Sequence, residues 1–173
     1  MDLVLKAGDA GTYHLDMNGA LLRCAIGKGG VRADKREGDG ATPVGRFPLR
    51  RTFYRKDRLA PPLGSKTPIE ITADLGWSDD PADAANYNRL VTLPYAGSHE
   101  RLMREDAVYD VVVELGYNDD PPVPGRGSAI FMHVARPDYS GTEGCVALAL
   151  PDLLSVLQQC GGEGTIVVPP DLA

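Results

Sequence analysis

The chain has 173 residues, of which 43% are hydrophobic and 24% charged, and its formal net charge is −6 at pH 7. These values are ordinary for a globular protein, and the length predicts one domain, residues 1–173, that needs no metal or disulfide to be stable. The acidic balance argues against a general nucleic-acid or anionic-membrane binder.

The N-terminus, MDLVLKAGDAGTYHLD, has no cationic lead, and polar residues interrupt it before a hydrophobic segment of signal-peptide length can form. No other apolar run is long enough to span a bilayer. We therefore expect a cytoplasmic protein if Met1 is the native start, and a periplasmic one if an export signal was trimmed. The odd number of cysteines, three, fits a reducing compartment.

The chain contains 20 glycines and 14 prolines, and the apolar runs between them are short, which is typical of an all-β domain. Asn18-Gly19 lies between two apolar segments and predicts a β-hairpin. β-branched and aromatic residues predict further strands within residues 45–55, 88–95, 109–117, 128–135, 145–150 and 165–170.

Residues 151–160 predict a helix, with Pro151 in the first turn, apolar residues on one face and Gly161-Gly162 as the stop signal. Residues 97–106 predict a second helix. The expected fold is mainly β: a β-sandwich or partly closed barrel with one or two short helices.

Several familiar sites are excluded. His99 to Met103 resembles a zinc-protease helix, but Met103 stands where the second histidine must be. No Ser-x-x-Lys motif, P-loop or dinucleotide fingerprint occurs. The pairs Asp79-Asp80 and Asp119-Asp120 lie in proline-bearing loops and are interpreted as solvated turn residues rather than calcium ligands. No metal or organic cofactor is implied.

Residues 129–148, AIFMHVARPDYSGTEGCVAL, place His133 at the end of one apolar strand and Cys145 at the start of the next. A cysteine nucleophile needs a base, because the thiolate attacks and a free thiol has a pKa of roughly 8.5. Gly144 permits close backbone approach, and the N–H groups around Cys145 can point at an oxyanion. The alternative is a buried thiol near a structural histidine.

This stretch resembles the active-site motif of the L,D-transpeptidase catalytic domain family, which has the YkuD-like fold. Residues 35–55, KREGDGATPVGRFPLRRTFYR, are similar to that family's segment around Asp-Gly-x-Thr-Pro-x-Gly. The resemblance runs from about Lys35 through the 151–160 helix. It implies a β-sandwich-type cysteine enzyme that acts on peptidoglycan stem peptides.

By this resemblance, Cys145 attacks the carbonyl of the diamino acid, D-alanine leaves, and an amine or water resolves the thioester. His133 matches the family's base, and Gly144 and Cys145 match its oxyanion region. We expect a Cys145–His133 ion pair in part of the resting enzyme.

The chain departs from the family pattern at two positions: Glu143 replaces the usual histidine, and Ala147 stands where an arginine is frequent. Glu143 either raises the thiol pKa or binds the ammonium of a diamino acid. Arg136 first, and Arg126 second, are candidate partners for the substrate carboxylate, with solvated loop cations as the alternative. Thr142 is a candidate to bond the substrate or the cysteine loop.

Three functions follow. The first is an L,D-carboxypeptidase that trims tetrapeptide to tripeptide in peptidoglycan recycling, since a cytoplasmic enzyme meets no wall to cross-link. The second is a periplasmic L,D-transpeptidase, and the third is a non-catalytic muropeptide-binding domain. The expected partners are tetrapeptides or muropeptides, neither nucleic acid nor membrane, and the oligomeric state is left open.

Overall fold

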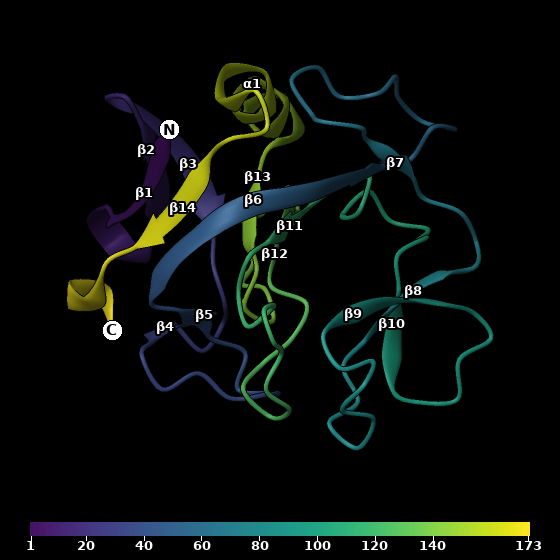
Figure 1. The fold of residues 1–173 in the computed structure, drawn as a ribbon. Helices are drawn as coiled ribbons and strands as arrows, with labels where there is room; N and C mark the ends of the chain where they lie inside the picture. Colours follow the sequence, from purple (N-terminus) through teal and green to yellow (C-terminus); the bar gives the residue numbers. More distant parts are fainter.

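A computed structural model describes residues 1–173 and is mainly β, with one α-helix (Figure 1). Helix α1 spans Leu150–Cys160, and two short 3-10 helices, η1 and η2, span Asp9–Gly11 and Pro170–Leu172. The strands are β1 (Asp2–Ala7), β2 (Tyr13–Met17), β3 (Ala20–Ala25), β4 (Val31–Arg32), β5 (Thr42–Pro43), β6 (Gly45–Tyr54), β7 (Ile69–Glu70), β8 (Leu75–Ser78), β9 (Arg89–Thr92), β10 (His99–Arg101), β11 (Val111–Leu115), β12 (Phe131–Val134), β13 (Val146–Leu148) and β14 (Thr165–Val168).

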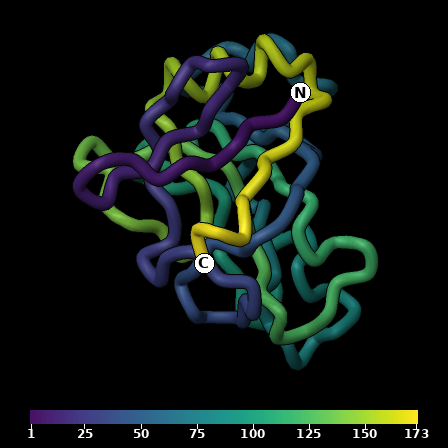
Figure 2. Tube along the Cα trace, turned by 90° about the vertical axis from the view of Figure 1, so that its left-hand side faces the viewer, coloured from purple at the N-terminus to yellow at the C-terminus, as the bar shows by residue number.

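The main sheet has the strand order β11-β12-β13-β3-β2-β1-β14-β6-β7, and β11 also pairs with β6. This extra pairing joins the two sides of the sheet into a barrel-like closure, with β7 attached to β6. The two ends of the chain run side by side because β1 pairs in parallel with β14, as the purple and yellow segments of Figure 2 show. The predicted fold class, a mainly β sandwich or partly closed barrel, is confirmed.

The local signals for the hairpin and the first helix are also confirmed. Asn18 and Gly19 both have positive φ, 53° and 91°, as a two-residue hairpin turn between β2 and β3 requires. Helix α1 ends at Cys160, and the left-handed conformation of Gly161 caps it. No helix in the structure has the length and apolarity that a bilayer crossing needs.

The second predicted helix, residues 97–106, is wrong. His99–Arg101 form strand β10, which pairs antiparallel with β8 in a separate sheet of order β10-β8-β9. A ten-residue helix is marginal by itself, whereas the free edge of β8 supplies backbone partners for this segment. The small sheet lies at the lower right of Figure 1.

Two apolar cores lie on opposite faces of the main sheet. The larger contains the side chains of β1, β2 and α1, together with Val111 and Val113 of β11. The smaller joins Val112 and Phe131 of the main sheet to Trp77 of β8. Alternation along β11 and β12 sends successive side chains to different cores. The smaller core also contains Cys145, so the cysteine lies under the small sheet.

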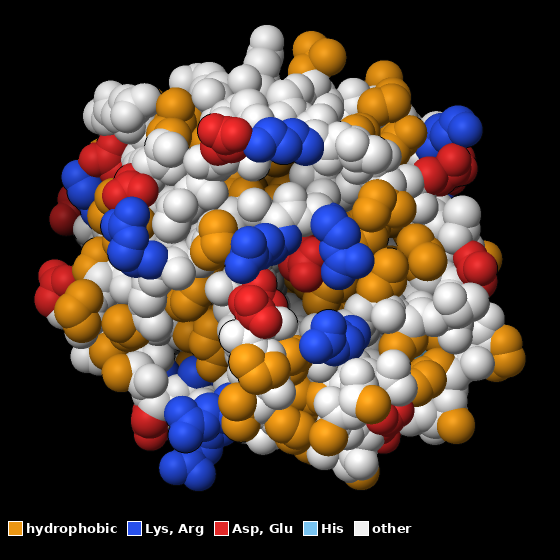
Figure 3. Space-filling model, viewed as in Figure 1, with side chains coloured by type: hydrophobic (Ala, Val, Ile, Leu, Met, Phe, Trp, Pro, Cys, Tyr) orange, Lys and Arg blue, Asp and Glu red, His pale blue; other side chains and the backbone are white.

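Acidic and basic side chains lie beside one another across the face that Figure 3 shows, with hydrophobic side chains scattered between them. Ion pairs between neighbouring strands and loops include Arg51–Glu114 at 2.6 Å and Arg50–Asp119 at 3.0 Å. This face therefore presents mixed charge rather than a continuous basic strip.

Candidate active site

The strand register places Cys145 and His133 on the same face of the main sheet. β12 and β13 are parallel, and His133 pairs with Ala147. Cys145, two residues before Ala147, therefore lies level with Phe131, whose backbone N–H donates to Cys145 Sγ at 3.4 Å. Both Cys145 and His133 line one cavity of about 350 Å³.

Hydrogen bonds hold each of these two side chains to the backbone. The Cys145 thiol donates to the carbonyl of Ala129, with Sγ 3.3 Å from the oxygen. His133 Nδ1 lies 3.0 Å from the carbonyl oxygen of Val134. Since a carbonyl only accepts, Nδ1 carries the proton and Nε2 is the basic nitrogen of the neutral ring. A backbone carbonyl thus orients the histidine.

Burial keeps the resting pair uncharged. It raises the pKa of the Cys145 thiol to about 12, with the charge of Glu100 as the next cause. It also lowers the pKa of His133 to about 4. At neutral pH both groups are therefore neutral, and no hydrogen bond joins them. The expected Cys145–His133 ion pair is wrong for the free protein, because burial penalises both charges.

The loop before Cys145 is shaped by Thr142 and Gly144. The Thr142 hydroxyl donates to the carbonyl of Cys145 at 2.7 Å and accepts from the N–H of Gly144 at 3.1 Å. Gly144 has φ +131°, and a Cβ there would lie 2.7 Å from the carbonyl oxygen of Ala41. Thr142 therefore makes a turn, and the N–H of Gly144 is already used. The N–H of Cys145 makes no hydrogen bond and is available as a backbone donor beside the thiol.

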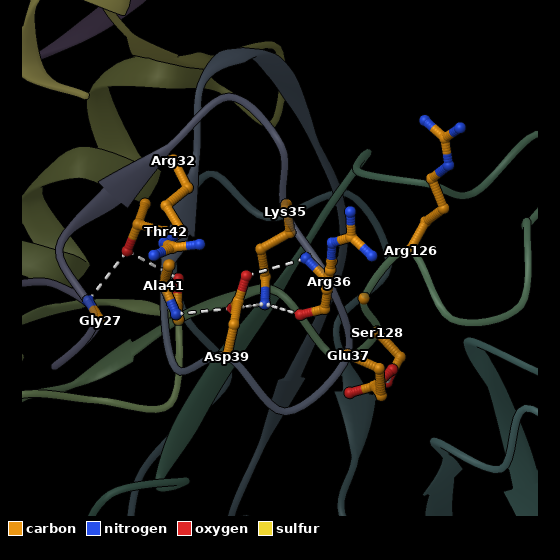
Figure 4. A network of polar contacts seen from close by, with 12 residues as sticks. Gly27, Arg32, Lys35, Arg36, Glu37, Asp39, Ala41, Thr42, Arg126 and Ser128 are labelled. Atoms are coloured by element: carbon orange, nitrogen blue, oxygen red, sulfur yellow. Dashed lines mark hydrogen bonds and ion pairs between the residues drawn. The ribbon is translucent and has the colours of Figure 1, made fainter.

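The Asp-Gly-Ala-Thr-Pro element packs against this loop. Thr42 Oγ1 accepts from the N–H of Gly27 at 2.9 Å and donates to the carbonyl of Gly144 at 2.9 Å. Figure 4 shows Thr42 beside Gly27 and the neighbouring Asp39 network. This buried hydroxyl links three segments and fixes where the cysteine loop lies.

Asp39 organises the turn that precedes Thr42. Its two carboxylate oxygens accept from the N–H of Ala41 at 2.9 Å and of Arg36 at 2.8 Å. The same carboxylate pairs with Lys35, whose side chain is only 4% exposed (Figure 4). Hydrogen bonds, with Lys35 foremost, outweigh burial and hold the pKa of Asp39 below its usual range. Residues 39–43 thus hold the cysteine loop in position but do not line the cavity.

The structure brings three of the four predicted substrate residues to the cavity, and of these only Arg136 has a side chain without a partner. Arg136 and Glu143 both line it; Arg136 is exposed and has no ion-pair partner, while Glu143 pairs with Lys28. Thr142 also lines the cavity, but its hydroxyl is engaged in the cysteine loop. Arg126 lines a different cavity, beside Tyr117 and Asn118, and not the cavity of Cys145.

Sequence reasoning missed several cavity residues. The small sheet and its flanks contribute Asp79, Glu100, Arg104 and Tyr109, and the loop after Lys35 contributes Glu37. The prediction that Asp79 is a solvated turn residue is wrong: Asp79 lines the cavity, and its Oδ1 is buried with no hydrogen-bond partner. Had residues 99–101 been predicted as a strand, Glu100 could have been recognised as a candidate, because the pairing of β10 with β8 brings it to the cavity.

A buried thiol and a histidine that share a cavity, with a backbone donor nearby, form a candidate site for cysteine-dependent acyl transfer. Residues 7–168 match the family model YkuD, the L,D-transpeptidase catalytic domain. The chain therefore belongs to this family, whose members are cysteine-dependent enzymes that act on peptidoglycan. No curated protein and no solved structure matches the chain.

Proposed function

We propose that this protein is an L,D-carboxypeptidase that removes the terminal D-alanine from peptidoglycan tetrapeptides. The observation that carries the proposal is the placement of Cys145 and His133 in one cavity of about 350 Å³. A cavity of this size takes the end of a stem peptide, since ligand sites span roughly 300–1,000 Å³. The family's peptidoglycan chemistry supplies the substrate class.

In the proposed reaction, Cys145 Sγ attacks the carbonyl carbon between the diamino acid and D-alanine. Nε2 of His133 takes the thiol proton as the C–S bond forms, and the N–H of Cys145 binds the oxyanion. His133 then protonates the amine of D-alanine, the C–N bond breaks, and a thioester remains. Water, deprotonated by His133, attacks the thioester and releases the tripeptide and the thiol.

Arg136 is the proposed partner for the carboxylate of D-alanine. The family often has an arginine two residues after the cysteine, but Ala147 occupies that position here and is buried beside His133. Arg136 lines the same cavity and has no ion-pair partner, so its guanidinium is free to bind a carboxylate.

Hydrolysis is proposed over transpeptidation because Cys145 is only 6% exposed. Water is small enough to enter the cavity of about 350 Å³ that Cys145 lines, whereas an amine acceptor must bring a whole second stem peptide to it. A neighbouring cavity of about 200 Å³ shares Gly141 but contains neither Cys145 nor His133, so it offers an acceptor no direct contact with the thiol.

We also propose the cytoplasm as the place of action, in peptidoglycan recycling. The three cysteines remain unpaired thiols, which suits a reducing compartment. Fractionation of cells that express the protein from its own gene tests this. Recovery in the periplasm would contradict it.

The activity test is mass spectrometry of the protein mixed with a diaminopimelate tetrapeptide, alone and with a second copy as amine acceptor. Tripeptide and free D-alanine without dimer are expected, and both products should disappear in Cys145→Ala and His133→Ala. A cross-linked dimer would instead indicate a transpeptidase. Binding without turnover by the wild type would indicate a muropeptide-binding domain.

A further inference from the structure

Glu100 lies in the catalytic cavity without a cationic partner. It belongs to β10, where it pairs with Trp77 of β8, and it lines the cavity with Cys145 and His133. Both of its oxygens accept from the hydroxyl of Tyr109 at 3.1 Å. The Tyr109 ring packs edge-on against His133, with the ring centroids 5.4 Å apart. The carboxylate is therefore held in place, but it forms no ion pair.

Two further carboxylates of the cavity, Glu37 and Asp79, also lack an ion-pair partner. Glu37 accepts from the Ser128 hydroxyl at 2.7 Å and from Tyr87, but forms no ion pair. Asp79 accepts no hydrogen bond, and its Oδ1 is buried. Since none of the three forms an ion pair, the cavity has an excess of carboxylate groups along this wall.

The other charges of the cavity do not cancel this excess. Arg104 donates to both oxygens of Asp106, at 2.8 and 2.7 Å, and Glu143 is paired with Lys28. Arg136 is then the one unpaired cation of the lining, against three unpaired carboxylates. The cavity is thus complementary to a ligand that carries a cation together with a carboxylate.

A buried carboxylate without a cation is costly, so it takes up a proton or binds a cation. Burial raises the pKa of Glu100 to about 7; Asp79 and Glu37 add to this rise, while Tyr109 and Arg104 oppose it. Near neutral pH Glu100 is therefore ionised in part of the molecules. A cation that enters the cavity draws it fully into the ionised form.

We propose that Glu100, with Asp79 beside it, is the subsite for the side-chain ammonium group of the diamino acid. This inference rests on the proposed function and names the feature of the substrate that the site selects. Glu143, the carboxylate that the sequence suggested for this role, is the weaker candidate, because its side chain is 73% exposed and already paired with Lys28.

The subsite also affects the nucleophile. The negative charge of Glu100 opposes formation of the Cys145 thiolate in the empty cavity. An ammonium group on Glu100 neutralises that charge just as the scissile carbonyl arrives. Substrate binding thereby lowers the cost of ionising the thiol, and a peptide without the ammonium does not have this effect.

Calorimetry with the Cys145→Ala protein tests the subsite without turnover. The ligands are a diaminopimelate tetrapeptide and the same peptide with 2-aminopimelate, which lacks only the side-chain ammonium. We expect Glu100→Gln in this background to weaken binding of the first peptide by roughly tenfold or more, the loss of one charge-assisted contact, and to leave the second nearly unchanged. Gln still accepts from Tyr109, and Glu70→Gln, an exposed carboxylate outside the cavity, is the charge control.

The inference would be overturned if Glu100→Gln bound the diaminopimelate peptide as tightly as the Cys145→Ala protein does. It would also be overturned if Glu100→Gln lost the same affinity for both peptides. Release of D-alanine by the wild-type enzyme is measured in parallel. If D-alanine is released and the preference for the ammonium survives Glu100→Gln, the subsite is refuted and the carboxypeptidase stands. If neither peptide binds and none is cleaved, both proposals fall.

Discussion

The hydroxyl of Thr42 donates a 2.9 Å hydrogen bond to the carbonyl of Gly144, which lies 102 residues later in the chain. The same oxygen accepts from the N–H of Gly27, so one buried hydroxyl joins the Thr-Pro element, an N-terminal loop and the cysteine loop. The contact explains how an early motif without a cavity-lining side chain of its own positions the nucleophile.

Thr42→Val should therefore impair both stability and activity. It leaves the N–H of Gly27 and the carbonyl of Gly144 unpaired in a buried place, at a cost of about 1–3 kcal/mol for each group. Thermal unfolding should show a lower Tm, and D-alanine release should fall because the cysteine loop shifts. Thr165→Val on β14, where the hydroxyl makes no side-chain hydrogen bond, is the control. Equal effects of the two variants would contradict this account.

Gly144→Ala should inactivate the enzyme. The new Cβ would meet the carbonyl oxygen of Ala41 at 2.7 Å, and φ of +131° disfavours any side chain. Gly125→Ala, at φ +83° with no atom within 4 Å of the new Cβ, adds backbone strain alone. We expect a much larger loss of Tm and turnover for Gly144→Ala than for Gly125→Ala, measured by circular dichroism and D-alanine release. Turnover of Gly144→Ala equal to wild type would refute the tight packing.

The Cys145 thiol of the free protein should be unreactive at neutral pH. Burial, followed by the charge of Glu100, raises its pKa to about 12, so the thiolate fraction is very small. Glu100→Gln removes the second cause and should speed alkylation by iodoacetamide at pH 8, read peptide by peptide in a mass spectrometer. Cys24, whose pKa burial alone raises to about 12, is an internal control that should not change. A wild-type thiol as reactive as a free cysteine would contradict the resting state described above.

Glu100 should also make the fold less stable as the pH rises. Its pKa moves from 4.5 to about 7 on folding, so the folded state holds the proton more tightly. That contribution is complete below pH 4.5 and is lost as the pH rises through about 7. Glu100→Gln should raise Tm relative to wild type by several degrees at pH 8, and by less at pH 4.5, since 1 kcal/mol moves Tm by roughly 2–4 °C at this size.

Comparing each variant with wild type at the same pH removes the opposite contribution of His133. Its pKa falls on folding, so its stabilising effect is lost as the pH falls from 6.5 toward 4. A Tm difference between Glu100→Gln and wild type that is the same at pH 4.5 and pH 8 would show that Glu100 is not perturbed.

Local chemistry determined much of this protein. Asn18-Gly19 sets the hairpin because both residues accept positive φ, and Pro151 and Gly161 bound the helix. The short strands and the motif around Cys145 indicated the mainly β family, which the match over residues 7–168 bears out. These features depend on neighbours in the chain, and so they can be read from it.

Long-range packing decided the rest. β10 became a strand only because β8 offers it an edge, and that pairing carries Glu100 to the cavity of Cys145. The neutral state of Cys145 and His133 follows from the burial of both side chains, which only the packing of distant segments produces. The sequence by itself determined which groups can react. The tertiary structure decided the charges of these groups and which carboxylates surround them, because desolvation and contact depend on segments far apart in the chain.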